Sequence, residues 1–562
     1  MILGAVFERE LRTAPRSRGL FVGRAVYCGM LLGIVATCWL VVTGSQTVAT
    51  VGDAARFGAT LLRILAPLQL VLAMLAAALN AVLAVGSEKD RRTLELLLVS
   101  RLGDGQLVVG KLAGSLLRVL LLLLAAAPVF ALAGLFGGVA AVQLVRLFVV
   151  TAAAAIATAS LANAIAFWKD TTFQSLAITA FGLVVWIALG ELAQARFGPA
   201  AAAAISPARA AFAALAVAGD GTLPRFLAVC LAVCAASTGV AVALARRWNT
   251  AQEARQTARG GRAAGGVGRA AGWTARRDVW SNPVLWREIC TRAHGRAMPL
   301  VRLAWLVLFA TAVAGVAAAT RGDRPDRLAV AVAVVPMALA SLLAVTAMAV
   351  TSVTTERDRG TFDLLLVSDL EPAEFVWGKV LGVLLAAREI VLLPVALCGA
   401  LVALGIATAE SGLYLALGLA LLLFFAAVLG LYAGLSHATS RRAIAVALGT
   451  VAFLFVGVAT AMRIMVAFGS SFELQLAPFL AVIVGGAVGL YAALSARNPS
   501  PAVAWASALL PALTFVAITG FLQGSTLQVF LVVTAAYGFA TTALLVPAIG
   551  AFDLLTGRAG AG

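Results

Sequence analysis

The chain has 562 residues, of which 62% are hydrophobic and 12% are charged, and its mean hydropathy is +1.01. Soluble domains are roughly half apolar, so this composition excludes a soluble globular protein and predicts a polytopic membrane protein. The formal net charge is +17, but the basic residues lie mostly in short segments between apolar runs, as the positive-inside rule expects of cytoplasmic loops. We therefore expect the lipid bilayer, and no nucleic acid, as the partner of this charge.

The amino terminus reads MILGAVFERELRTAPRSRG, with its charged residues after the first apolar stretch. A signal peptide has positive charge first and a small-residue cleavage site later, so no cleaved segment is expected. Ile2, Leu3, Val6 and Phe7 can share one face of a short helix. This pattern predicts an interfacial helix on the cytoplasmic surface.

Six apolar runs in the first half predict six membrane-spanning helices, because a span needs roughly 20 such residues. Their predicted ranges are 22–43, 61–85, 107–136, 139–167, 172–192 and 225–245. Between the fifth and sixth runs, the Ala-rich stretch 196–222 contains Gly-Pro and Ser-Pro pairs. This stretch predicts a partly re-entrant external element.

An Arg-, Gly- and Ala-rich stretch at 246–281 separates the halves 1–245 and 282–562 and predicts a cytoplasmic linker of low order. Six crossings bring the chain back to the cytoplasm, so both termini are expected there. Apolar segments after residue 443 exceed what six helices require, which predicts an extra carboxy-terminal hairpin or a re-entrant piece. The predicted fold is an all-α polytopic membrane protein with 12–14 spans in total.

One segment occurs twice: EKDRRTLELLLVS at 88–100 and ERDRGTFDLLLVS at 356–368. The copies are 268 positions apart, and the match continues downstream, where Gly110-Lys111 aligns with Gly378-Lys379. Upstream, Arg9-Glu10 aligns with Arg287-Glu288 at an offset of 278. The chain is therefore predicted to be a tandem repeat, and the linker gives both halves the same orientation.

The repeated segment has an apolar stripe at helical spacing. The stripe residues are Leu94, Leu97, Leu98 and Leu102 in the first copy and Phe362, Leu365, Leu366 and Leu370 in the second. Glu88, Arg92 and Glu95 fall on another face, so the segment predicts one amphipathic cytoplasmic helix between the second and third spans. One interpretation is an interfacial helix with an internal Glu88–Arg92 pair; the other is a docking surface, which the repeated acidic register favours.

Residues 105–111 fit the first seven positions of a phosphate-binding loop, but Leu112 stands where Ser or Thr would hold magnesium. The second copy has Ala373 in place of the first glycine. ATP binding is therefore not expected here. Lys111 and Lys379 are instead predicted to extend to the cytoplasmic headgroups.

Ionisable residues inside apolar runs are functional candidates by default. The clearest in this chain are Arg118, Arg388, Glu389 and Arg463. Adjacent helical residues point about 100° apart, so Arg388 and Glu389 are expected to meet other helices and not each other. They could fix helices together or line a transport path, and the first interpretation is favoured.

The pattern acidic-x-acidic-x-x-Thr-hydrophobic-acidic-Leu-Leu-Leu, followed by a polar turn and Gly-Lys, resembles the region after the second span of ABC-2 type exporter permeases. The resemblance is clearest over 86–125 and 354–395. It implies two permease halves, each with an interfacial helix and a coupling helix that contact an ATP-binding cassette ATPase. The coupling residues that it implies are Glu88, Thr93, Glu95, Leu96, Glu356, Thr361, Asp363 and Leu364.

The resemblance also implies that the chain is not itself an enzyme and holds no cofactor. ATP would be hydrolysed on two copies of a separate ATPase subunit, and the chain would lie in the inner (cytoplasmic) membrane. Two other functions stay open: a secondary transporter, and a scaffold that recruits a cytoplasmic protein without transporting anything. With two histidines in the chain, no catalytic or metal-ligand constellation is recognisable. The substrate cannot be identified from the sequence.

Overall fold

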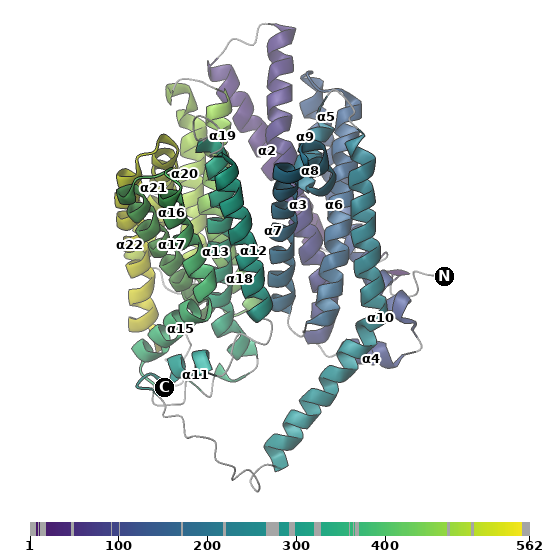
Figure 1. Ribbon diagram of the computed structural model, residues 1–562, viewed down its shortest axis with the longest axis vertical. Helices are drawn as coiled ribbons and strands as arrows, with labels where there is room; N and C mark the ends of the chain where they lie inside the picture. The colour runs from purple at the N-terminus through teal and green to yellow at the C-terminus, as the bar shows by residue number, and fades with distance from the viewer. Residues whose placement is uncertain are drawn as a thin grey trace. The chain divides into compact units, whose positions relative to one another are not determined.

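The computed structural model describes most of the chain (Figure 1). The described residues are 7–8, 11, 18–45, 50–90, 93–100, 102–169, 172–216, 221–265, 280–290, 298–319, 327–358, 360–362, 365, 370–468, 472–495 and 500–553. All regular structure within these ranges is helical, as the composition predicts. The predicted amino-terminal interfacial helix falls mostly outside them.

Nine helices of the described part are long and apolar enough to cross a membrane, and one bent helix pair would make a tenth. Four shorter apolar helices accompany them. Helices dominate because every backbone N–H and C=O must be paired inside a bilayer. The chain is therefore an all-α polytopic membrane protein, and the 12–14 predicted spans require some of the shorter helices to cross as well.

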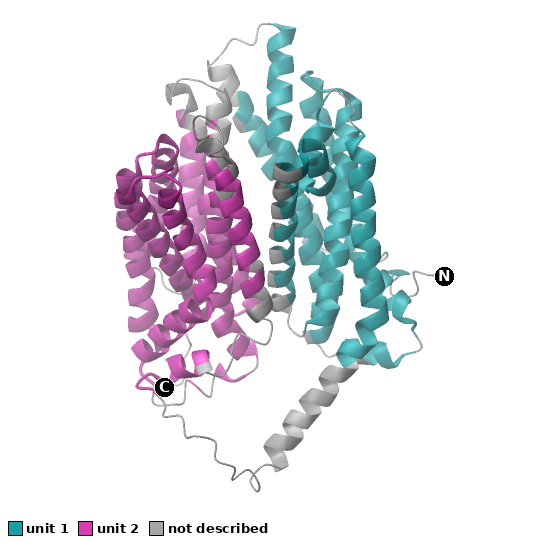
Figure 2. Ribbon diagram, in the orientation of Figure 1, with its two compact units in different colours: residues 1–276 teal, residues 277–562 magenta. Residues whose placement is uncertain are grey.

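The chain divides into two compact units, Met1–Arg276 and Arg277–Gly562 (Figure 2). This division falls within the predicted linker. The first part of that linker is helical, because the last long helix of unit 1 runs on to Gly265. The prediction of low order is therefore wrong for 246–265, and 266–279 lie outside the described residues.

Unit 1 is a helical bundle. Its helices are α2 (Arg18–Ser45), α3 (Val51–Asp90), α4 (Thr93–Val99), α5 (Asp104–Leu135), α6 (Ala141–Trp168), α7 (Thr172–Phe197), α8 (Pro199–Ile205), α9 (Pro207–Ala214) and α10 (Thr222–Gly265). Fully buried alanines such as Ala77, Ala81, Ala159 and Ala162 line the contact of α3 with α6. Small side chains allow membrane helices to approach closely, so this seam forms the core of the unit.

The short helices α8 and α9 occupy the stretch predicted to be re-entrant. Gly198, with φ +86°, precedes α8, and the fully buried Ser206 joins the two helices. A Cβ atom on Gly190 of α7 would lie 2.2 Å from the Cβ atom of Ser206, so only glycine permits this contact. The two helices pack on α3, α6, α7 and α10; the depth that they reach in a membrane stays a prediction.

Unit 2 is a second helical bundle. Its helices are α11 (Pro283–Cys290), α12 (Met298–Ala319), α13 (Arg327–Asp358), α15 (Pro372–Ala386), α16 (Arg388–Ala403), α17 (Ala409–Ser436), α18 (Ser440–Ala452), the π-helix η2 (Phe453–Gly457), α19 (Val458–Phe468), α20 (Phe472–Leu494), α21 (Pro501–Gln523) and α22 (Thr526–Gly550). The closing α21–α22 hairpin turns at Gly524, with φ +80°, and α22 packs on α17. The seam between α13 and α17 forms the core, where a Cβ atom on Gly430 would lie 2.5 Å from the Thr346 carbonyl oxygen.

The third apolar run of unit 2 is not one straight helix. α15 and α16 meet at Ala387 with a bend of 64°. In unit 1 the corresponding run is the single helix α5. The bend places Arg388 and Glu389 in the first turn of α16, whereas the sequence suggested that they lie within a continuous span.

Candidate functional site: the base of each unit

The repeated segment lies at one end of each unit, where α3 is followed by α4 and α5, or α13 by α15. We call this end the base of the unit. In unit 1, the Leu94 side chain of α4 is 3% exposed and packs on the core, with Leu97 and Leu98 beside it. Leu96 and Val99 on the same helix are 73% and 87% exposed. The predicted apolar stripe is therefore confirmed, and two further apolar side chains project away from the unit.

The second copy is anchored by aromatic side chains. Phe362 is 3% exposed, and its ring centroid lies 6.0 Å from that of Phe375 on α15. Phe375 in turn lies 5.4 Å from Phe552, which follows α22. Leu365 and Leu370 are half-buried, and Leu366 lies outside the described residues.

Glu88 and Glu356 do not belong to the short segment. Each lies in the last turn of a long helix, α3 or α13, so the prediction of one amphipathic helix starting at Glu88 is wrong. In the second copy the chain turns at Gly360, whose φ of +67° lies in the left-handed region that favours glycine. In the first copy, α3 ends at Asp90 and α4 begins at Thr93.

Lys111 faces the interior of unit 1. Its side chain is 3% exposed and pairs with the carboxylate of Glu88, which is 12% exposed. The prediction that Lys111 extends to the headgroups is therefore wrong. The physical reason is that the end of α3 brings a carboxylate to the second turn of α5, and a buried ammonium requires such a partner.

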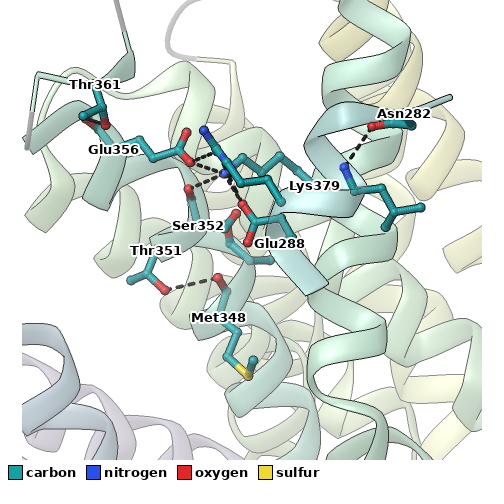
Figure 3. A network of polar contacts seen from close by, with 11 residues as sticks. Asn282, Glu288, Met348, Thr351, Ser352, Glu356, Thr361 and Lys379 are labelled. Carbon is teal, nitrogen blue, oxygen red and sulfur yellow. Dashed lines mark hydrogen bonds and ion pairs between the residues drawn. The ribbon is translucent and has the colours of Figure 1, made fainter. Parts of the chain in front are cut away.

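Lys379 has the same arrangement in unit 2, with an additional acid (Figure 3). Its side chain is fully buried, and Nζ lies 2.6 Å from Glu288 Oε1, 2.7 Å from Glu356 Oε1 and 2.9 Å from the Ser352 carbonyl oxygen. These contacts use all three donors of the ammonium group. Arg287 also pairs with Glu356, so two cations balance two carboxylates. Lys379 does not reach the headgroups either.

The cation that follows each of these glutamates binds the end of another helix. Lys89 Nζ donates to the carbonyl oxygens of Phe167, at 2.9 Å, and Lys169, at 2.8 Å, where α6 ends. The last carbonyls of a helix lack partners within that helix, so a cation from a neighbouring helix stabilises them.

In unit 2, Arg357 takes the place of Lys89. It donates to the carbonyl oxygens of Leu435, at 3.4 Å, and His437, where α17 ends. All three positions are 268 residues beyond those in unit 1. The two units therefore make the same contact although the cation differs.

A third link is described in unit 2. Both carboxylate oxygens of Asp358 accept from Ser440 Oγ, at 2.6 and 2.7 Å, where α18 begins. Glu356, Arg357 and Asp358 thus connect α13 to α11, α15, α17 and α18. We call these three residues the unit 2 hub, and Glu88 with Lys89 the unit 1 hub; the Asp90 side chain is outside the described part.

The two threonines predicted as coupling residues form hydrogen bonds to the hubs. Thr93 Oγ1 donates to the Glu88 carbonyl oxygen at 3.3 Å, and Thr361 Oγ1 donates to that of Glu356 at 3.1 Å. Each threonine therefore ties the start of the short segment to the last turn of the preceding helix.

Four of the predicted site residues lie partly or wholly outside the described part of the chain. Glu95 lies on α4 and Arg463 on α19, but their side chains are outside the described part, as are Asp363 and Leu364 altogether. Arg118 is half-buried on α5.

Arg388 and Glu389 form a contact that was not expected. Arg388 Nε lies 3.1 Å from Glu389 Oε1, and Arg302 Nε of α12 lies 3.2 Å from Glu389 Oε2. The prediction that the adjacent residues cannot pair is wrong, because the long and 61% exposed arginine side chain reaches the neighbouring carboxylate. The expectation that Glu389 meets another helix is confirmed.

Sequence reasoning missed the hub cations Lys89 and Arg357, and the lysines that pair with the hub glutamates, as site residues. The available signal was the repetition of a cation at Lys89 and Arg357 and of a lysine at Lys111 and Lys379 at one offset. An acid and a base that both recur at fixed positions can be explained by pairing with each other.

No protein-family model and no curated protein matches this chain. The resemblance to ABC-2 permeases therefore stays an expectation from the repeated segment and its surroundings in the sequence.

Proposed function

We propose that the chain is the membrane subunit of an ATP-driven exporter of the ABC-2 permease type, powered by a separate ATP-binding cassette ATPase. The observation that carries the proposal is the short segment on the base of unit 1. Its inner face packs on the core through Leu94, while Leu96 and Val99 project outward. Apolar side chains held on a firmly anchored helix beside the bilayer suit a partner protein better than water.

The repetition supports the same proposal. Hub, lysine and short segment recur at positions 268 apart, and the shared contacts are made within each unit separately. Two such bases in one chain suit the two subunits of an ATPase dimer. Glu88 pairs with Lys111 and Glu356 with Lys379, which removes these two carboxylates from the proposed docking face. The exposed apolar residues Leu96 and Val99 are left to form it in unit 1.

The experiment is co-purification of the tagged chain from its own membranes, with any bound ATP-binding cassette ATPase identified and quantified. Leu96→Asp places a charge on the proposed contact and should remove most of the bound ATPase. Val51→Asp is the matched control, because Val51 is 89% exposed at the other end of α3 and should not affect binding. Equal ATPase recovery with both variants would contradict docking at α4.

The energy source requires a second measurement. ATP hydrolysis by the complex in proteoliposomes should depend on the membrane chain. If the chain binds the ATPase but leaves its hydrolysis rate unchanged, the scaffold interpretation is the better one.

A further inference from the structure

The hubs make contacts that simple attachment of a short helix does not require. A loop that only binds a partner protein can do so with the side chains of the loop itself. Here Glu88 and Lys89, which end α3, also contact two other helices, α5 and α6. Because adjacent residues on a helix point about 100° apart, an acid followed by a cation can hold two neighbours at once. The last turn of α3 is therefore fixed to the start of α5 and to the end of α6.

The buried lysines connect each hub to the third apolar run of its unit through opposite charges. Lys111 and Lys379 are 3% and 0% exposed. Buried ion pairs seldom add stability over apolar residues of similar volume. Their presence at the same position in both units is therefore better explained by a need to keep one geometry than by stability.

The short segments are joined to these pairs directly. Thr93 and Thr361 bond the carbonyl groups of the glutamates that hold the lysines. A displacement of the segment would thus be carried into α5 or α15 through Glu88–Lys111 or Glu356–Lys379.

We propose that Lys111 and Lys379 are positioning residues for energy coupling: they transmit movement of the short segments, driven by the ATPase, to the third run of each unit. This inference rests on the proposed function. In unit 2, Lys379 also holds Glu288, so α11 moves with α15. The transmission passes through discrete ion pairs whose separation would disconnect ATP hydrolysis from helix movement.

The test uses a paired substitution that removes both charges. Glu88→Gln with Lys111→Met leaves similar volumes and no lone charge from this pair, so the fold should survive. The reporter is Leu135→Cys, at the far end of α5 and 83% exposed, in a chain whose native cysteines are replaced. Its rate of modification by a membrane-impermeant maleimide is compared between nucleotide-free and vanadate-trapped complexes in proteoliposomes.

We expect the parent complex to change its labelling rate on trapping. In the paired variant the ratio of trapped to free rates should move to about 1, while ATPase binding and hydrolysis persist. The charge-swapped variant, Glu88→Lys with Lys111→Glu, should restore the change. Arg247→Met, which removes an exposed cation of α10, is the matched control and should behave as the parent.

A paired variant that responds to trapping as the parent does would overturn the proposal, as would a parent whose reporter does not respond. Loss of both ATPase binding and the response in the paired variant would assign the pair a structural role instead. A parent chain that binds no ATPase overturns the proposed function as well, which separates that failure from failure of the lysine proposal alone.

Discussion

Lys379 of α15 and Glu356 of α13 form a 2.7 Å ion pair in which the lysine side chain is fully buried. The same lysine holds Glu288 of α11 at 2.6 Å. One ammonium group therefore fixes three helices at the base of unit 2, and its removal would take away a positive charge that both Glu288 and Glu356 contact.

This charge balance predicts opposite outcomes for two variants. Lys379→Met alone leaves an uncompensated carboxylate and should destabilise the protein by about 3–5 kcal/mol. Adding Glu356→Gln restores neutrality, because Glu288 keeps Arg287 at 3.7 Å, and should recover most of the loss. The apparent Tm in detergent measures both, with Arg442→Met, an exposed cation near the same base, as the control. Equal Tm values for the single and paired variants would contradict the charge balance.

The helices and the apolar stripe of α4 could be predicted from the sequence, because both depend on local composition and spacing. The placement of Leu94 inside and Leu96 outside follows from helical geometry alone. The role of Lys111 could not be predicted in this way. Whether a lysine at the start of a span reaches the headgroups or turns inward depends on which helix end lies beside it, and that is a tertiary relationship.

Two further corrections, at Glu88 and at Arg388 and Glu389, have a similar origin. The amphipathic helix predicted from Glu88 onward required an unbroken helix. Glu88 instead lies in the last turn of α3, and a new helix, α4, begins at Thr93. The placement of Arg388 and Glu389 within a continuous span likewise assumed a straight helix through Ala387. In both cases the helix ends inside a stretch whose local pattern is compatible with continuation.

The seam between α13 and α17 predicts a strong dependence on glycine. A Cβ atom on Gly430 would lie 2.5 Å from the Thr346 carbonyl oxygen and 2.7 Å from Ala349 Cβ, whereas one on Gly418 of the same helix meets nothing within 4 Å. Gly430→Ala should therefore lower the Tm. Gly418→Ala should leave it unchanged or raise it slightly, since alanine is favoured over glycine in helices by about 1 kcal/mol. Similar Tm values for the two variants would argue against close packing at Gly430.

The contacts of Glu389 with Arg302 and Arg388 predict unequal effects of substitutions at Glu389 and at Arg388. Glu389 is 23% exposed and binds Arg302 on another helix, whereas Arg388 is 61% exposed and adjacent in sequence. Glu389→Gln should lower the Tm because it removes the charge that joins α12 to α16. Arg388→Ala should have little effect, since exposed pairs contribute at most about 1 kcal/mol. A larger loss for Arg388→Ala would favour a role of the exposed arginine beyond helix contact.

The orientation of the bases can be tested with two cysteine variants in a chain that lacks its native cysteines. Val51 begins α3 and is 89% exposed, and Leu96 follows the end of that helix and is 73% exposed. α3 has 40 residues and is therefore about 60 Å long, enough to place its ends on opposite sides of a bilayer. Because arginines cluster around the base, the positive-inside rule predicts that Leu96 lies on the cytoplasmic side. A membrane-impermeant maleimide should label Val51→Cys in intact cells and Leu96→Cys only in inside-out vesicles; the reverse pattern would place the bases outside the cell and exclude a cytoplasmic ATPase as their partner.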